Sequence, residues 1–294
     1  MSLFTSLRAR FAAGRRVPVT HALATTLVIV TFHATTAMAV DGVFEINQTC
    51  AVDTGCFNGD SAGFPVTITL SGSYVLTSNL GREFASGDVN DDRIQITADD
   101  VRLDLNGFAI RCSILVFPGG DTCTGTADGI EATGDRVTVE NGSIKGWGGS
   151  GVIVGDHSVV RNLTSGLNGR YGIFGSTGTI IQGNNVHDNG IDGISAQQAS
   201  LVRDNTAHDN GQDGIDVSFT GLVVDNVVYN NTSDGIEASA GGRVTRNVSR
   251  SNDGFGLNLS STVAYSDNTV TDNSTVQGGH NTGGNSCQGS SICP

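Results

Sequence analysis

The chain has 294 residues, of which 41 are Gly and 15% are charged, and its formal net charge is −13. Gly at about twice its usual frequency, together with few charged helix formers, excludes a helical bundle or a coiled coil, while 37% hydrophobic residues exclude general disorder. The acidic composition disfavours nucleic acid and anionic membranes as partners.

The first 39 residues have the pattern of a secretory signal peptide. Four Arg and no acidic residue occur in the first 20 positions, an apolar stretch spans residues 22–32, and residues 37–39 (Ala-Met-Ala) form a small-x-small cleavage site. The apolar stretch is too short and too rich in Thr for a stable membrane span. We therefore expect cleavage before Val40 and a secreted or periplasmic protein.

The six Cys of the chain all lie after this segment, in three close pairs. Export to an oxidising compartment favours disulfides, and pairing within each close pair is the favoured connectivity because nothing brings distant pairs together. We expect these disulfides to be structural: Cys50/Cys56, Cys112/Cys123 and Cys287/Cys293.

The remaining chain divides into a cap with opening coils (40–100), a run of repeats (101–276) and a C-terminal cap (277–294). Residues 66–70 and 74–76 are predicted opening strands. Residues 112–126 are rich in Gly and bounded by two Cys, which predicts a protruding loop.

The repeats follow a period of 21 residues in three independent rows. Fixed periods of this size indicate stacked supersecondary units. The rows are Asn168, Asn189, Asn210, Asn231, Asn252 and Asn273; Asn184, Asn205, Asn226, Asn247 and Asn268; and Gly151, Gly172, Gly193, Gly214, Gly235 and Gly256.

Within one repeat the apolar residues alternate with polar ones, as Ile236 and Ala238 do around Glu237. This spacing of two is typical of strands, and the strands are short and separated by Gly, Asn and Asp turn signals. Short strands in coils of constant length predict a parallel β-helix with a rise of about 4.8 Å per coil. Residues 21 apart then lie above one another, and we expect the Asn rows to form structural amide ladders inside the coils.

The motif Asn-x-x-x-x-Asn-x-x-Asp-Gly-Ile at 205–215 and 226–236, with the opening segment 41–47 and the closing segment 283–287, resembles the secreted right-handed parallel β-helix repeat proteins of the pectin-lyase-like superfamily. The resemblance implies an all-β, single-stranded right-handed solenoid with disulfide-stapled caps. It also implies a choice among polysaccharide lyases, glycoside hydrolases, uronate epimerases, adhesins and proteins without known activity, because fold alone does not select one.

Candidate site residues come from outward rows of the repeat. We expect adjacent rows to form one patch about three coils tall, since coils stack at about 4.8 Å. The predicted catalytic residues are Asp213, Asp216, Asp234, Glu237, His208 and Tyr229, and the predicted binding residues are His187, Asp192 and Arg250.

Crowded carboxylates suggest two chemistries and one structural alternative. One carboxyl with a raised pKa can act as an acid while another acts as a base, as in glycoside hydrolysis. Alternatively, calcium binds to a uronate carboxylate and to four acidic residues, Asp213, Asp216, Asp234 and Glu237. His208 or Tyr229 then transfers the C5 proton of the uronate. The structural alternative is that Asp before Gly is ordinary turn chemistry and that the His row is solvated.

The functional prediction is an exported monomer that binds or acts on extracellular or periplasmic polysaccharide or a cell-surface glycan, as a lyase, hydrolase or epimerase would. The Gly-His-Gly and Arg-Ile-Lys motifs of polygalacturonase-type hydrolases and the Asp-Pro-His of the epimerases are absent from the sequence. Trp147, Tyr171 and Phe174 are candidates for sugar stacking, although packing is the favoured interpretation. The alternative function is a non-catalytic surface scaffold or adhesin.

Overall fold

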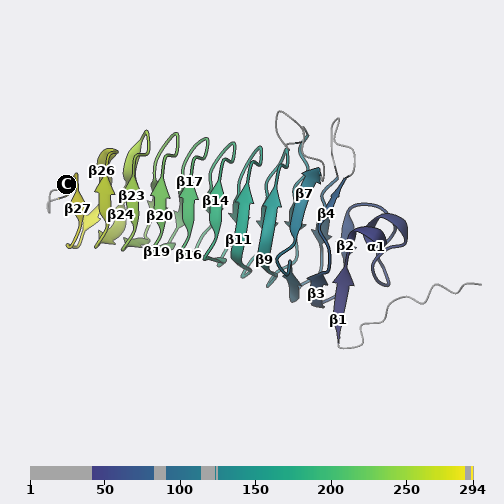
Figure 1. Cartoon of the computed structure of the whole chain (residues 1–294). Coiled ribbons are helices and arrows are strands. Elements are labelled where there is room, and N and C mark those ends of the chain that lie inside the picture. The colour runs from purple at the N-terminus through teal and green to yellow at the C-terminus, as the bar shows by residue number, and fades with distance from the viewer. Residues whose placement is uncertain (1–41, 83–90, 114–122, 124, 289–292, 294) are drawn as a thin grey trace, which may run out of the picture. The chain divides into compact units, whose positions relative to one another are not determined.

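The computed structural model describes residues 42–82, 91–113, 123, 125–288 and 293. The predicted signal peptide (1–39) and most of the predicted loop (112–126) lie outside these residues. Within them the chain forms 27 β-strands and one short helix, and the strands pair in parallel. The coils stack in one row from β1 (Val43–Ile46) to β27 (Ser286–Cys287), as Figure 1 shows. The predicted parallel β-helix is confirmed.

Three columns of stacked strands enclose the core. The first column holds β2 (Val66–Ile68), β5 (Ile94–Ile96), β8 (Ile130–Ala132), β10 (Val152–Val154), β12 (Ile173–Gly175), β15 (Ile194–Ala196), β18 (Ile215–Phe219), β21 (Ile236–Ala240) and the starts of β24 (Phe255–Ser266) and β26 (Ser274–Asn281). The second holds β1, β3 (Gly72–Leu76), β6 (Val101–Asp104), β9 (Thr138–Lys145), β11 (Val159–Gly166), β13 (Ile180–Gln182), β16 (Leu201–Arg203), β19 (Leu222–Val224), β22 (Arg243–Thr245) and the ends of β24 and β26. The third holds β4 (Leu80–Arg82), β7 (Ala109–Ser113), the ends of β9 and β11, β14 (Asn185–His187), β17 (Thr206–His208), β20 (Val227–Tyr229), β23 (Val248–Arg250), β25 (Thr269–Thr271) and β27.

Inward positions of the first column repeat one type of apolar side chain. In the first column Ile173, Ile194, Ile215 and Ile236 pair in direct register and are fully buried. Each such side chain contributes about 1.5–3 kcal/mol on removal from water. The alternation in the sequence therefore sets which side chains form the core and which face outward.

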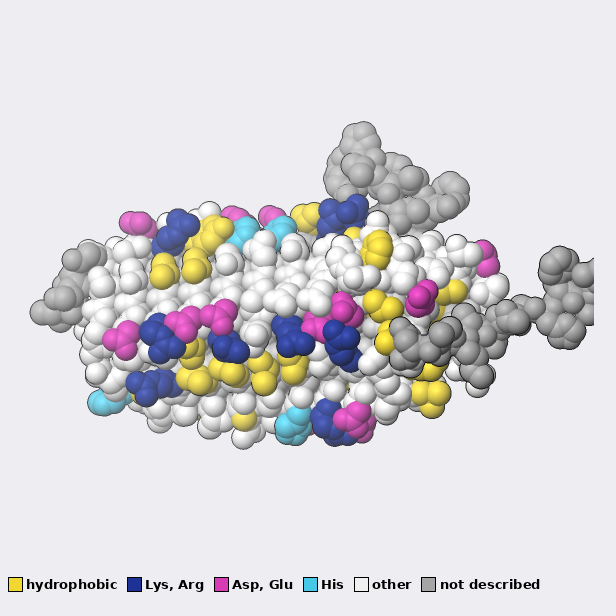
Figure 2. Space-filling model, turned by 60° about the horizontal axis from the view of Figure 1, so that its bottom comes forward, with side chains coloured by type: hydrophobic (Ala, Val, Ile, Leu, Met, Phe, Trp, Pro, Cys, Tyr) yellow, Lys and Arg dark blue, Asp and Glu magenta, His cyan; other side chains and the backbone are white. Residues whose placement is uncertain are grey.

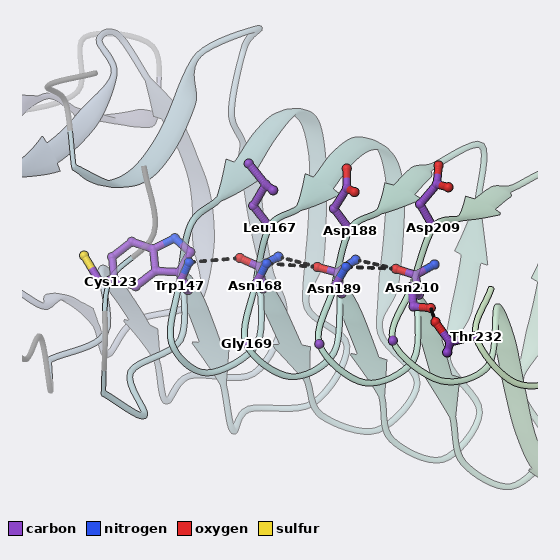
Figure 3. Close-up of a pocket in the computed structure, with 12 residues that line it drawn as sticks. Cys123, Trp147, Leu167, Asn168, Gly169, Asp188, Asn189, Asp209, Asn210 and Thr232 are labelled. Atoms are coloured by element: carbon purple, nitrogen blue, oxygen red, sulfur yellow. Dashed lines mark hydrogen bonds between the residues drawn. The ribbon is translucent and has the colours of Figure 1, made fainter. Parts of the chain in front are cut away.

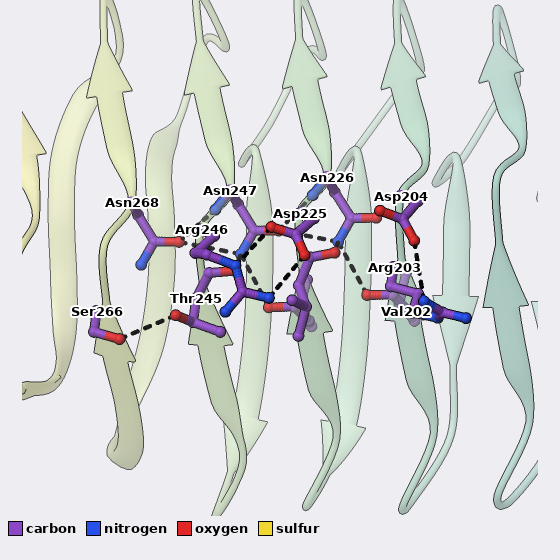
Figure 4. A network of polar contacts seen from close by, with 12 residues as sticks. Val202, Arg203, Asp204, Asp225, Asn226, Thr245, Arg246, Asn247, Ser266 and Asn268 are labelled. Carbon is purple, nitrogen blue, oxygen red and sulfur yellow. Dashed lines mark hydrogen bonds and ion pairs between the residues drawn. The ribbon is translucent and has the colours of Figure 1, made fainter.

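Two Asn ladders run through the interior, as predicted. In the first, each amide Nδ2 donates to the Oδ1 of the Asn one coil later, for example Asn168 to Asn189 and Asn189 to Asn210, both at 2.9 Å (Figure 3). In the second, Asn226 donates to Asn247 at 3.0 Å (Figure 4). The same Oδ1 atoms also accept backbone N–H groups of the preceding coil, as Asn247 does from Asn226 at 2.9 Å.

The turns that carry the ladders depend on a residue with positive φ just before each Asn. Asp204, Asp209 and Asp225 have φ of 57°, 56° and 57°. Asp and Asn tolerate this left-handed conformation better than most residues. The bend turns the following Asn into the interior, where its amide meets the next coil.

The Gly that starts each first-column strand is required by close packing. A Cβ on Gly214 would clash with Cγ1 of Val228 and lie 2.7 Å from Nδ2 of Asn231. The Gly row of the sequence thus marks the places where the third column and the Asn ladder press against the start of the first column.

The N-terminal end carries helix α1 (Gln48–Asp53), which lies beside β1 and β2 in Figure 1. The Asn47 side chain caps it by accepting from the backbone N of Cys50 at 3.0 Å. The amide of Gln48 exchanges two hydrogen bonds with Gly81. All three predicted disulfides are present, Cys50–Cys56, Cys112–Cys123 and Cys287–Cys293, whereas the predicted domain boundaries stay predictions.

The coils before residue 151 depart from the regular period. Consecutive first-column strands there are 28, 36 and 22 residues apart, judged from their paired residues Val66, Ile94, Ile130 and Val152. Trp147 takes the ladder position one coil before Asn168, whose Oδ1 accepts its backbone N–H at 3.2 Å. The Arg93 guanidinium lies over the rings of Phe64 and Trp147, 3.8 and 5.0 Å from their centroids.

The second column carries most of the ion pairs on its outer face. Glu140 is almost fully buried between Arg102 and Arg161, and Arg246 pairs with Asp225 at 2.8 Å (Figure 4). Figure 2 shows basic and acidic side chains alternating along one face beside a stripe of hydrophobic ones. None of the helices among the described residues has the length and apolarity needed to cross a bilayer.

Candidate functional site

An Asp row lies in the turn that leads into the first column. Asp192, Asp213 and Asp234 each stand directly before the Gly that starts a strand, and each is under 10% exposed. Oδ1 of Asp192 accepts the backbone N–H of Asp213 at 3.1 Å, and Oδ1 of Asp213 accepts that of Asp234 at 2.7 Å. Each carboxylate is therefore held by the next coil through one oxygen.

The outward row of the first column places two further acids beside this turn. Asp216 and Glu237 are directly paired in the strand register. Carboxylate oxygens of Asp213, Asp234 and Glu237 lie within 4.8 Å of one another, and Asn258 donates to Oδ2 of Asp234 at 2.8 Å. We call this set the acidic centre: Asp192, Asp213, Asp216, Asp234 and Glu237.

Burial and mutual repulsion raise the pKa of three carboxyls of the acidic centre, those of Asp192, Asp216 and Glu237. Burial first, and the charges of Asp213 and Asp216 next, raise the pKa of Glu237 to about 7. Burial, opposed by a backbone hydrogen bond and aided by nearby acids, raises the pKa of Asp192 to about 7. Burial and the Asp213 charge raise the pKa of Asp216 to about 6. Near neutral pH the centre can therefore accept a proton or a cation.

The predicted His, Tyr and Arg row is a continuous stack on the third column. The rings of His187 and His208 are 5.2 Å apart, those of His208 and Tyr229 are 4.7 Å apart and nearly parallel, and the Arg250 guanidinium lies 4.5 Å over Tyr229. Nδ1 of each His lies against the carboxylate of the following Asp, at 2.7 and 2.6 Å. Among the described residues, no hydrogen bond engages Nε2 of either ring.

The structure brings the acids together and the rings together, in two different columns. In the described part of the chain no hydrogen bond, ion pair or ring contact joins the ring stack to the acidic centre. The turns that connect the third column to the first form a groove of about 530 Å³. Asp188 and Asp209 line it, together with the Gly that follows each Asn of the first ladder (Figure 3). The catalytic and binding roles assigned from the sequence stay predictions.

A second acidic cluster, formed by Asp92, Asp128 and Glu131, lies at the first column. The sequence did not point to it. Oδ1 of Asp92 accepts the backbone N–H of Asp128 at 2.7 Å. Burial raises the pKa of Asp92 to about 6, with Asp128 and Glu131 adding to the rise. Residues 128–131 read Asp-Gly-Ile-Glu, as do residues 234–237, but the 36-residue spacing hides them from a search at 21.

Comparisons with known proteins agree with this architecture. A family model described as "Right handed beta helix region" matches residues 110–252. Among solved structures, the Azotobacter vinelandii mannuronan C-5 epimerase AlgE4 A-module has 15% identity and a TM-score of 0.59, with 79% of this chain and 68% of that chain covered. Pectate lyase Pel9A has 15% identity and a TM-score of 0.55, with 82% and 74% covered. The periplasmic alginate epimerase AlgG has 12% identity and a TM-score of 0.52, with 82% and 72% covered.

The fold and the family model define the class of the protein as a right-handed parallel β-helix. None of the curated proteins matches the sequence. Sequence identities of 12–15% to the solved structures support a shared fold and do not support a shared activity. The repeat motif that predicted this fold, at 205–215 and 226–236, lies within the matched residues.

Proposed function

We propose that the protein is exported and acts on a polysaccharide bound along its first column, in the manner of a lyase, hydrolase or epimerase. The observation that carries the proposal is the convergence of carboxylate oxygens of Asp213, Asp234 and Glu237 within 4.8 Å, at the outer face of the first column and the turn that leads into it. Solved structures of the same fold, two epimerases and a pectate lyase, support it. The three disulfides support export to an oxidising compartment.

Calcium is the cofactor that these residues fit. The donor set consists of carboxylate oxygens, and oxygens on opposite sides of a calcium ion are up to about 5 Å apart, which accommodates the observed cluster. Asp213 and Asp234 are already oriented by backbone N–H groups. When bound, calcium supplies positive charge that polarises the carboxylate of a uronic acid and acidifies the neighbouring C–H.

Proton transfer by the centre itself is the hydrolase-like form of the same proposal. Glu237, with its pKa raised to about 7, keeps a proton near neutral pH, and Asp213 beside it is the second carboxyl of the pair. His208 and Tyr229, stacked on the third column, are proposed to serve a lyase or epimerase reaction on a substrate that also reaches that column.

A non-catalytic scaffold is the second candidate, and one observation favours it. Asp192, Asp213 and Asp234 each accept a backbone N–H of the next coil. This bond satisfies a buried donor, so the Asp row has a structural use without any ligand.

The test is a screen of uronate and neutral polysaccharides with calcium or with a chelator. The variants are Asp213→Asn, which keeps an acceptor for the backbone N–H of Asp234, and Glu237→Gln. We expect binding or turnover by the wild type, at least tenfold weaker in both variants, and no change in the control Asp272→Asn, an exposed turn residue on the third column. Failure of the wild type to bind any glycan would favour the scaffold.

Export has its own test. The mass of protein recovered outside the cytoplasm is expected to match a chain that begins at Val40. A protein that keeps its first 39 residues would contradict the predicted cleavage.

A further inference from the structure

The coil that precedes the acidic centre presents two aromatic rings on the first column. Tyr171 stands at the turn position one coil before Asp192, and Phe174 is paired in register with Ser195, which is paired with Asp216. The two rings lie 5.6 Å apart between centroids, tilted by 40°. They therefore extend the two rows that form the acidic centre.

These rings are surface features rather than core. Ile173 between them is fully buried, so strand alternation turns Phe174 outward, and both Phe174 and Tyr171 stay partly exposed. Trp147, the other aromatic of this region, is only 1% exposed and fills a ladder position inside the coil. Ile153, paired with Phe174 in the preceding coil and also partly exposed, lengthens the apolar strip.

A cation accompanies the rings. Arg170 is exposed, and its guanidinium carbon lies 5.4 Å from the Tyr171 centroid. Its positive charge also acts on Asp128, which lies toward the second acidic cluster. Along the first column, Arg170 and the two rings therefore lie between the second acidic cluster and the acidic centre.

The spacing of the coils matches a bound sugar chain. Coils stack at about 4.8 Å, close to the length of one sugar unit in an extended 1,4-linked chain. Phe174 lies two coils from Asp216 and three from Glu237, or about 10 and 14 Å. A chain that runs along the stack would place successive sugars over successive coils.

Resting on the function proposed above, we propose that Tyr171 and Phe174 form a stacking subsite for one sugar ring, and that Arg170 binds the carboxylate of that sugar. The C–H face of a pyranose packs against aromatic rings, and a guanidinium forms strong paired hydrogen bonds with a carboxylate. The subsite positions a uronic-acid chain so that a unit two or three sugars away lies over the acidic centre.

The experiment measures binding of defined oligogalacturonates and oligomannuronates, from dimers to hexamers, by calorimetry with calcium present. Phe174→Ala and Arg170→Ala are each expected to weaken binding about tenfold for oligomers of four or more units, and to leave dimer binding unchanged. Phe174→Tyr, which keeps a ring, is expected to bind like the wild type. Leu222→Ala and Arg246→Ala, exposed side chains of the second column, are the matched controls.

The outcomes separate this inference from the function on which it rests. If the wild type binds long oligomers and Asp213→Asn weakens this binding while Phe174→Ala and Arg170→Ala both bind like the wild type, the subsite is overturned and the proposed function stands. If Phe174→Ala weakens binding of the long uronate oligomers and Arg170→Ala does not, the assignment of Arg170 is overturned. If the wild type binds no glycan, both proposals are overturned. Thermal unfolding of each variant shows whether a loss of binding reflects loss of fold.

Discussion

The coils before residue 151 and those after it fill the same interior in different ways. The later coils repeat one arrangement, in which the Asn Nδ2 donates a hydrogen bond to Oδ1 of the Asn one coil later, at 2.8–3.1 Å. The earlier coils vary in length, place Trp147 in a ladder position and stack Arg93 on two rings. Cys112 and Cys123 add a covalent link there. Repetition thus fixes the register of the later coils, whereas bulk and a cross-link hold the earlier ones.

The largest expected effect comes from the close-packed Gly row of the regular coils. Gly214→Ala places a Cβ against the buried side chains of Val228 and Asn231. We expect a loss of about 4–5 kcal/mol or failure to fold, measured by denaturant unfolding. Gly107→Ala is the control in the earlier region, where no atom lies within 4 Å and only the positive φ costs about 1 kcal/mol. Similar losses in the two variants would contradict the comparison.

Removing one ladder amide is expected to have the next largest effect. Asn226→Ala leaves the backbone N–H and side chain of Asn205 without their acceptor and Oδ1 of Asn247 without its side-chain donor. The loss should be about 3–5 kcal/mol, because several buried groups become unsatisfied together. Asn226→Asp keeps the acceptor and loses the donor. An Ala variant as stable as the wild type would show that the ladder does not hold the register.

The disulfide of the earlier region should contribute less. Replacing both Cys112 and Cys123 by Ser is expected to lower the free energy of unfolding by about 2–3 kcal/mol, as for a short closed loop. Calorimetry should show the loss mainly in the opening coils, and hydrogen exchange in β18 and β21 should stay unchanged. Loss of protection throughout the later coils would mean that the two regions are not independent.

The smallest effect concerns pH. The pKa of Glu237 is raised to about 7, against about 4.3 in an unfolded chain, so the folded protein binds the extra proton between these values. Stability should fall as pH rises from about 4 to 7 and remain lower above that. Glu237→Gln removes the share of this dependence that Glu237 contributes, while Asp192 and Asp216 keep theirs, and it should be more stable than the wild type at pH 8 by about 1 kcal/mol, after allowance for solvent screening.

The measurement is thermal unfolding from pH 4 to pH 8 in a chelator. Calcium added at pH 8 is expected to stabilise the wild type and to have little effect on Glu237→Gln. A variant with the same pH profile as the wild type would remove Glu237 from the acidic centre's titration.

Periodicity predicted what lies along the stack and does not specify the distances between columns. Rows spaced by 21 gave the Asn ladders and the alignment of Asp216 with Glu237, since a constant coil length fixes axial neighbours. The position of His208 relative to Asp216 around the coil depends on the turn between their strands. A repeat period does not specify the conformation of that turn. The structure accordingly places the rings and the acids on different columns.

Two features needed coordinates for other reasons. The backbone hydrogen bond accepted by each turn Asp follows from the three-dimensional approach of two coils, and turn chemistry alone predicts only that Asp is tolerated there. The cluster of Asp92, Asp128 and Glu131 was hidden because the segment that includes residues 112–126 stretches the spacing to 36 residues.

The Asn ladders have a consequence for the length of the molecule. Each amide contacts only its counterparts one coil away, so nothing in the interior records how many coils precede or follow it. Excising residues 205–225 would bring Asn226 to the position of Asn205, below Asn184, and the same bonds could close. The protein can therefore be shortened or extended by whole coils, and each coil changes its length by about 4.8 Å.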